Sequence, residues 1–276
     1  MNRRMFLQAI AAGAATLQAP GLYAGQKRAG ERQGVDASVK DYLFRIRNPD
    51  MRHAGDVIAG DQSKVTLRRV NAHLLKVRRV VGFGNFNVLG FDDMLRYARR
   101  YPKIGTFGHD ELEMLEALFY EDAAQYGFYG EKPLGEITEC IDRRDVVKIP
   151  RTGHYLFAGE PQKLYEKVRK QVGGRLVLTS GVRSVVKQMQ LFVAKADRSD
   201  GNLSLASRSL APPGYSFHGI GDFDVGVRGW GARNFTTEFA TTDEFKRLLD
   251  LGYIEIRYPA DNRLGVRFEP WHIKVS

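Results

Sequence analysis

The sequence of 276 residues contains a single cysteine, Cys140. One cysteine cannot form an internal disulfide, and without a Cys-x-x-Cys pair a zinc site built on thiolates is excluded. We therefore expect Cys140 to be a small buried side chain. The fold must depend on its hydrophobic core, for which a hydrophobic content of 43% is sufficient.

Long apolar runs are also missing. No stretch reaches the roughly 20 apolar residues needed to span a bilayer, so we expect no transmembrane anchor. The sequence has neither an internal repeat nor a GxGxxG or Walker loop. It therefore gives no indication of a repeat protein or of the common nucleotide-binding folds.

Acidic residues are too few to balance the basic ones. The chain has 42 Lys and Arg against 32 Asp and Glu, which gives a formal net charge of +10. The basic residues are dispersed and belong to no nucleic-acid-binding motif, so a nucleic-acid partner is the weakest interpretation. A solvated basic surface, or contact with an anionic extracellular polymer, agrees better with this pattern.

The N-terminus resembles a bacterial twin-arginine signal peptide. Arg3 and Arg4 precede a weakly apolar run at residues 9–15, and Ala24 offers a small-residue cleavage site. We therefore expect residues 1–24 to be a signal peptide that is removed after Ala24. The mature protein is then exported to the periplasm.

Three parts follow the expected signal peptide. Residues 25–62 are polar and irregular, which indicates a linker, and residues 63–144 are expected to form a small helical domain. Apolar periodicity predicts its helices, with Asp110 as the cap of the last one. The predicted ranges are 63–81, 91–98 and 110–125.

Residues 145–276 mix helical and strand patterns without a βαβ repeat, which favours the α+β class. We expect a small mixed or antiparallel sheet with flanking helices. The predicted helices cover 160–172, 184–196 and a segment capped by Thr241, with a polar loop at 197–209. The predicted strands cover 176–179, 254–258, 266–268 and 273–275.

Candidate chemistry gathers near the C-terminus, where two histidines each have a carboxylate close by. His218 is followed by Asp222 and Asp224, and Glu269 precedes His272 by three residues. Two imidazoles and a carboxylate are the ligands of a catalytic zinc site with an open position for water. In a strand Asp222 and Asp224 would share a face, so either can be the carboxylate ligand.

Glu269 suits the general base that activates the water on zinc. Strict strand geometry would place Glu269 and His272 on opposite faces, but Pro270 can bulge the chain and turn both toward the metal. Trp271 either forms a wall of the substrate pocket or fills the core.

Three motifs in this part of the chain resemble those of the LAS zinc peptidases, most closely the VanY-type D-alanyl-D-alanine carboxypeptidases. Members carry Ser-Gly-Tyr-Arg-Ser with a later Gln, then Ser-x-His-x-x-Gly-x-Ala-x-Asp, then Glu-x-Trp-His. The matching segments are 180–184 with Gln188, 216–224 and 269–272. The resemblance covers about residues 145–276, and three motifs in the same order make it specific.

The resemblance implies a role for each matching residue. His218, Asp224 and His272 would bind Zn²⁺, and Glu269 would be the catalytic base. Arg183 would hold the carbonyl oxygen as it becomes an oxyanion. The residues expected to contact the peptide are Ser216, Gln188 and Trp271.

The chain departs from the family pattern at three points, one of which is Val182 in place of the tyrosine of the arginine motif. Five residues separate His218 from Asp224, where the family has six, so Asp222 remains the alternative ligand. Phe223 stands where the family has alanine, and we expect its ring to narrow the pocket.

The function that this resemblance implies is that of an exported zinc D-alanyl-D-alanine carboxypeptidase acting on peptidoglycan stem peptides. The alternatives are an endopeptidase that cuts peptide cross-bridges and a zinc-containing module that binds the cell wall without cutting it. Glu269 argues against pure binding, which needs no base. A carboxypeptidase must also recognise a free carboxylate, and the sequence has too many arginines to identify the cation that does so.

Overall fold

The computed structural model describes residues 35–276, with side chains described from residue 41. The predicted signal peptide and its cleavage site lie outside the described residues. None of the helices in the described part combines the length and the apolar character needed to cross a bilayer.

Helices and strands alternate in the second half of the chain, whereas helices dominate the first. The helices are α2 (Val35–Arg47), α3 (Asp61–Val81), α4 (Phe83–Phe86), α5 (Phe91–Arg100), α6 (His109–Tyr120), α7 (Glu160–Val172), α8 (Val185–Arg198), α9 (Leu203–Ser209) and α10 (Asp243–Asp250). The strands are β1 (Val146–Lys148), β2 (Tyr155–Phe157), β3 (Leu176–Ser180), β4 (Phe223–Val227), β5 (Glu255–Ile256) and β6 (His272–Lys274).

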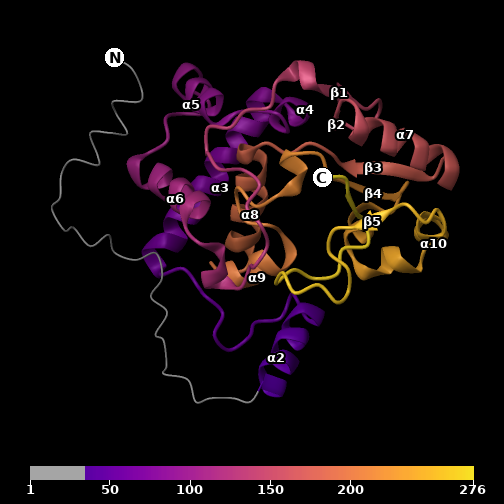
Figure 1. Cartoon of the computed structure of the whole chain (residues 1–276). Coiled ribbons are helices and arrows are strands. Elements are labelled where there is room, and N and C mark those ends of the chain that lie inside the picture. The colour runs from indigo at the N-terminus through magenta and orange to yellow at the C-terminus, as the bar shows by residue number, and fades with distance from the viewer. Residues whose placement is uncertain (1–34) are drawn as a thin grey trace.

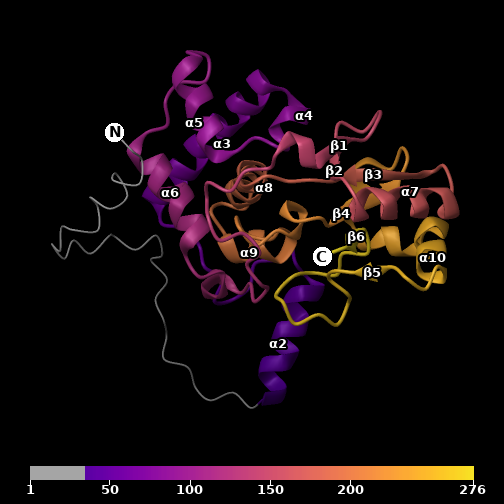
Figure 2. The ribbon, with the colours of Figure 1, turned by 45° about the horizontal axis from the view of Figure 1, so that its top comes forward.

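The main sheet is antiparallel, with the strand order β3-β4-β6-β5. The hairpin of β1 and β2 forms a separate two-stranded sheet. Figures 1 and 2 show the main sheet with α7 and α10 on one side of the molecule and α3, α5, α6, α8 and α9 on the other. Helices segregated from a small antiparallel sheet define the α+β class, so the predicted class is confirmed.

The register of the sheet brings three polar side chains into one row. Asp224 on the central strand β4 pairs with His272 on β6 and, across a bulge, with Ser180 at the end of β3. Directly opposed residues in an antiparallel sheet have Cβ atoms about 5 Å apart. Residues separated by about fifty positions in sequence therefore meet at one point on the sheet.

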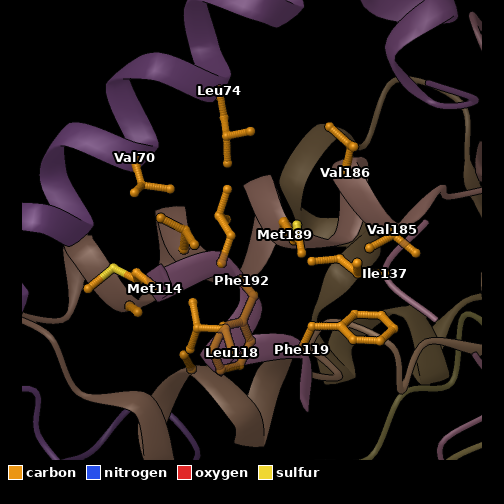
Figure 3. Packing of buried hydrophobic residues seen from close by; sticks show 14 of the residues in the cluster. Val70, Leu74, Met114, Leu118, Phe119, Ile137, Val185, Val186, Met189 and Phe192 are labelled. Carbon is orange, nitrogen blue, oxygen red and sulfur yellow. The ribbon is translucent and has the colours of Figure 1, made fainter. Parts of the chain in front are cut away.

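Most of the helices share one hydrophobic cluster, in which α8 is central. Figure 3 shows Val70 and Leu74 of α3 and Leu118 of α6 packed around Met189 and Phe192 of α8. All five side chains are buried, and full burial of such a side chain contributes about 1.5–3 kcal/mol. This cluster crosses the boundary that the sequence predicted at residues 144 and 145, because α8 and α9 belong to it.

A second hydrophobic cluster lies between the sheet, α7 and α10. Phe223 and Val225 of β4 pack in it with Tyr165 and Val168 of α7. The Phe223 ring is fully buried and meets Tyr165 edge to face, with ring centroids 5.9 Å apart. The expectation that Phe223 narrows the substrate pocket is therefore wrong, because its ring fills the core under the sheet.

Helix α9 occupies part of the segment that the sequence predicted to be a polar loop. Asn202 caps it by accepting a hydrogen bond from the backbone N–H of Leu205 at 2.8 Å. The serines of α9 are buried, and the Ser207 hydroxyl donates to backbone carbonyls of Ser204 and Tyr126. Tertiary contacts thus stabilise a helix that amphipathic periodicity does not reveal.

Two predicted helix caps are wrong by one or two residues. The N-cap of helix α6 is Gly108 and not Asp110, and the helix begins at His109. The Gly108 N–H donates to the side chain of Glu111 at 2.7 Å. Helix α10 is capped by Thr242, which accepts from the N–H of Phe245 at 3.1 Å, and not by Thr241.

Residues 266–268 do not form the predicted strand. The Val266 carbonyl accepts a hydrogen bond from the Asn262 side chain, and the Arg267 N–H donates to the Arg208 carbonyl. These backbone groups are therefore occupied outside any strand ladder.

Cys140, predicted to be buried, is exposed.

Helix α2 lies within the segment predicted to be an irregular linker. It is fastened to the rest of the molecule by Tyr42, whose hydroxyl donates to the Asn262 carbonyl and accepts from the Gly265 N–H. Ile46 of the same helix is buried.

Candidate metal centre

A cavity of about 350 Å³ lies where the end of the sheet meets α8. Its wall contains residues of all three motifs described above. The motif residues that line it are Ser180, Arg183, Ser216, His218, Asp224, Glu269, Trp271 and His272. Most of the side chains predicted to form the site therefore line one cavity.

His218 enters the site from a short 3-10 helix, Phe217–Gly219, and its side chain is fully buried. Gly221, at φ 145°, then turns the chain into β4 with a backbone conformation that favours glycine. Nδ1 of His218 lies 2.9 Å from the Gly181 carbonyl. A carbonyl can only accept, so Nδ1 carries the proton and Nε2 presents a lone pair.

Burial, and then the nearby guanidinium of Arg183, lowers the pKa of His218 to about 4. The imidazole is therefore neutral at physiological pH. Its Nε2 is buried without a hydrogen bond and lies 3.2 Å from Oδ1 of Asp224, which also has no hydrogen bond. Two electron-pair donors facing each other at this distance in a buried site favour a cation beside both.

Burial alone would raise the pKa of Asp224, but the imidazole of His218 and the guanidinium of Arg183 hold it well below its usual range. Asp224 is thus ionised. Its second oxygen, Oδ2, accepts a hydrogen bond from Nη2 of Arg183, whose Nε donates to the Ser180 hydroxyl at 2.9 Å. Arg183 is therefore held against the edge of the cavity beside Asp224.

His272 has carboxylates on both sides of its ring. Nε2 lies 3.1 Å from Asp222, whereas Nδ1 lies 3.2 Å from Glu269 and 3.7 Å from Asp224. Burial alone would lower its pKa, but Asp222 and Glu269 raise it to about 9. This environment favours positive charge at the ring, carried by either a proton or a metal ion.

Asp222 has a different set of partners from Asp224. Its carboxylate accepts two hydrogen bonds from the Arg257 guanidinium, at 2.7 and 3.0 Å, and one from the Val275 N–H at 2.8 Å. Because Arg257 and Val275 occupy the Asp222 carboxylate, Asp222 is suited to orient the His272 ring through Nε2. Nδ1 of His272 then faces Asp224. The geometry therefore favours Asp224 over Asp222 as the ligand.

The ligand atoms of His218, Asp224 and His272 lie within 4.8 Å of one another. Nitrogen and oxygen ligands about 2.0–2.1 Å from a tetrahedral zinc ion are about 3.3 Å apart. The pairs at 3.2 and 3.7 Å are close to that separation. Two imidazoles and one carboxylate, with lone pairs available and a cavity beside them, fit Zn²⁺ with one open position.

Glu269 reaches this centre through a turn rather than a strand bulge. The His272 N–H donates to the Glu269 carbonyl at 3.1 Å, which closes a four-residue turn with Pro270 at its second position. The Glu269 and His272 side chains consequently face the same point. Sequence reasoning foresaw that Pro270 would align them, although the expected device was a bulge.

The three predicted peptide-contacting residues do not all line the cavity. Ser216 and Trp271 do, and Trp271 also packs in the second hydrophobic cluster. Gln188 lies outside the cavity wall, and its side-chain amide donates to the Ala211 carbonyl. Because Ala211 lines the cavity, Gln188 supports the wall from behind.

The cavity wall also contains residues that were not predicted, among them His154, Lys187, Lys195, Tyr258 and Arg267. They belong to none of the three motifs, and sequence spacing offers no signal for them. Burial, and then Arg183 and Lys187, lowers the pKa of His154 to about 4, so this imidazole is neutral.

Replacing Gly181 by alanine is expected to weaken zinc binding by about 10- to 100-fold, the usual effect of losing a partner that orients a ligand. A Cβ at this position would overlap the carbonyl oxygen of Tyr155, which the Val182 N–H contacts at 2.8 Å. The backbone must then shift, and with it the carbonyl that orients His218. Zinc titration of the metal-free protein measures the effect.

Gly174→Ala provides the matched control, because a Cβ at Gly174 meets no heavy atom within 4 Å. The control should bind zinc like the wild type. Equal zinc affinity in the Gly181 variant would contradict the role of this carbonyl.

Comparison with known proteins finds one matching family model. Residues 157–275 match the family described as VanY: D-alanyl-D-alanine carboxypeptidase. No curated protein matches the sequence.

Solved structures similar to the chain include three peptidases. The LdcB LD-carboxypeptidase is 23% identical with a TM-score of 0.38, and the match covers 49% of this chain and 69% of that one. The vancomycin-resistance D,D-pentapeptidase VanY, in complex with Zn(II), is 19% identical with a TM-score of 0.37 over 54% of this chain and 87% of that one. The D,D-dipeptidase VanXYg is 21% identical with a TM-score of 0.39, and the match covers 48% of this chain and 53% of that one.

Proposed function

We propose, because residues 157–275 match the family described as VanY: D-alanyl-D-alanine carboxypeptidase, that the protein is an exported zinc carboxypeptidase that removes the terminal D-alanine of peptidoglycan stem peptides. The observation that carries the proposal is the convergence of two unpaired, buried ligand atoms, those of His218 and Asp224, with Glu269 beside an open cavity. Export rests on the Arg3-Arg4 pattern at the N-terminus.

The residues that would hold the metal are His218, Asp224 and His272. When bound, zinc supplies a Lewis acid that polarises the peptide carbonyl and lowers the pKa of water. Glu269 stands within 3.2 Å of Nδ1 of His272, so its carboxylate can take a proton from water at this point and pass it to the leaving amine. Its position at the end of a hydrogen-bonded turn fixes the carboxylate without a strand partner.

Arg183 provides the fixed positive charge of the site. Its guanidinium lines the cavity beside Asp224, where it can donate to the carbonyl oxygen of the scissile bond as negative charge develops there. Ser216 and Trp271 form the wall against which the peptide lies. Asp222 keeps the His272 ring oriented through Nε2.

The alternative of a non-catalytic binding module is less well supported. A module that only holds wall peptides needs no general base such as Glu269 in addition to Asp222, which already orients His272, whereas hydrolysis requires one. The second alternative, cleavage of peptide cross-bridges, uses the same chemistry and differs only in the substrate that the cavity accepts.

The mature protein is expected to release one D-alanine per molecule of a muramyl pentapeptide, and a zinc chelator should abolish this release. Added Zn²⁺ should restore it, because the ligands lie on hydrogen-bonded elements of the fold, the 3-10 helix at Phe217–Gly219 and the paired strands β4 and β6. D-alanine is measured with a coupled oxidase assay. Release that persists in full after the metal has been removed would contradict the proposal.

If the zinc-loaded protein releases no D-alanine, intact sacculi are the informative second substrate. Soluble fragments released from sacculi would favour the endopeptidase. Zinc-dependent binding to sacculi without any release would favour the module.

A further inference from the structure

Lys187 is a buried cation in the wall of the catalytic cavity. It lies in the first turn of α8, its residue is only 6% exposed, and it lines the same cavity as the metal ligands. Its backbone N–H donates to the Ser184 hydroxyl that caps the helix, which fixes the start of the side chain. Among the described residues, none hydrogen-bonds to its ammonium or pairs with it.

The other cations in this wall already have polar partners. Lys195 pairs with Asp50 at 2.7 Å, and Arg183 pairs with Asp224. Arg267 donates to the Phe235 carbonyl at 3.1 Å, and its guanidinium lies 5.1 Å from the Trp271 ring centroid. Lys187 thus differs from its neighbours in having no hydrogen-bond partner in the described part of the chain.

The surroundings of Lys187 make this position unfavourable without an anion. Its ammonium lies 5.5 Å from the Phe83 ring centroid and 5.9 Å from that of Phe86, which offer only weak cation–π attraction. Burial, together with the like charges of Arg183 and Arg78, lowers its pKa to about 8. Buried charges in proteins are normally paired, so an anionic ligand is the expected partner.

We propose that Lys187 binds the free C-terminal carboxylate of the peptide substrate and thereby makes the enzyme a carboxypeptidase rather than an endopeptidase. This inference rests on the proposed peptidase function of the same cavity. Lys187 follows Arg183 by four residues across the start of α8, and both side chains line the cavity. In a substrate the terminal carboxylate lies one residue beyond the scissile carbonyl, and consecutive Cα atoms are about 3.8 Å apart.

The test compares a pentapeptide that ends in a free D-alanine carboxylate with the same peptide ending in a carboxamide. In the wild type, kcat/KM should be about 10- to 100-fold higher for the acid, the range expected for losing a hydrogen bond to a charged group. Lys187→Met keeps the length and the apolar stem but removes the charge, so it should lose most of this preference through a higher KM. Lys187→Arg should retain it.

Lys195→Met is the matched control, because it removes an amine from the same cavity wall that already has a partner. Its preference for the acid should equal that of the wild type. A pH profile adds a second readout. The titratable and charged groups near the Lys187 ammonium are Arg183, Arg78 and His154. Deprotonation of this ammonium should lower kcat/KM for the acid above about pH 8. Lys187→Arg should not show this decline.

The outcomes separate this inference from the proposed function. If Lys187→Met cleaves the acid and keeps the wild-type preference over the amide, the inference is wrong and the peptidase stands. If the wild type cleaves both peptides equally, the carboxylate is not recognised, and the inference is again overturned. If the zinc-loaded wild type cleaves neither peptide nor sacculi, the proposed function itself fails.

Discussion

Replacing Glu269 by glutamine is expected to lower kcat for D-alanine release by about 100- to 10,000-fold, the range typical of a lost general base. Glutamine has nearly the same shape but cannot accept the proton. The turn that carries residue 269 is closed by backbone atoms of Glu269 and His272, so it does not depend on the carboxylate. The variant should therefore fold and still bind one zinc ion per chain.

The measurement pairs steady-state kinetics with metal analysis of the same preparation. Glu244→Gln is the matched control, since Glu244 is a buried carboxylate that pairs with Arg175 and lies outside the cavity wall. The control should keep the wild-type kcat. Full activity in the zinc-loaded Glu269 variant would assign the base to another group.

His218→Ala is expected to reduce zinc affinity by more than about 100-fold, the upper end of what losing an outer partner alone causes. The variant removes a neutral imidazole whose Nε2 has no other partner, and activity should be lost with the metal. Zinc stoichiometry after dialysis against a weak chelator is the direct readout.

His73→Ala serves as its control because His73 is also buried but hydrogen-bonds to Glu111 on α6, outside the cavity wall. It should retain zinc even if it is less stable. One zinc ion per chain in the His218 variant under the same dialysis would refute its role as a ligand.

Sequence reasoning predicted that His218, His272 and a carboxylate would meet but left the choice between Asp222 and Asp224 open. Both carboxylates are buried, and spacing along a strand treats them alike. What separates them is long-range, because Arg257 and the last residues of the chain occupy Asp222. No local pattern records such partners.

The turn at Glu269 shows what local chemistry can predict. Pro270 was sufficient to expect Glu269 and His272 on the same side, although the expectation was a strand bulge and the structure has a turn with proline at its second position. The helix α9 and the cation Lys187 show the opposite. Their positions depend on which segments cover them, and neither amphipathic periodicity nor a motif marks them.

The central position of α8 has a practical consequence for anyone shortening the protein. One side of this helix carries Lys187 into the cavity, and another side, with Met189 and Phe192, fills the cluster built by α3 and α6. A fragment starting at residue 145 would retain every motif residue but expose that apolar side to water. Such a fragment should aggregate or fail to fold into a defined structure. We therefore expect that residues 145–276 do not fold alone, and engineered versions should retain α3 and α6.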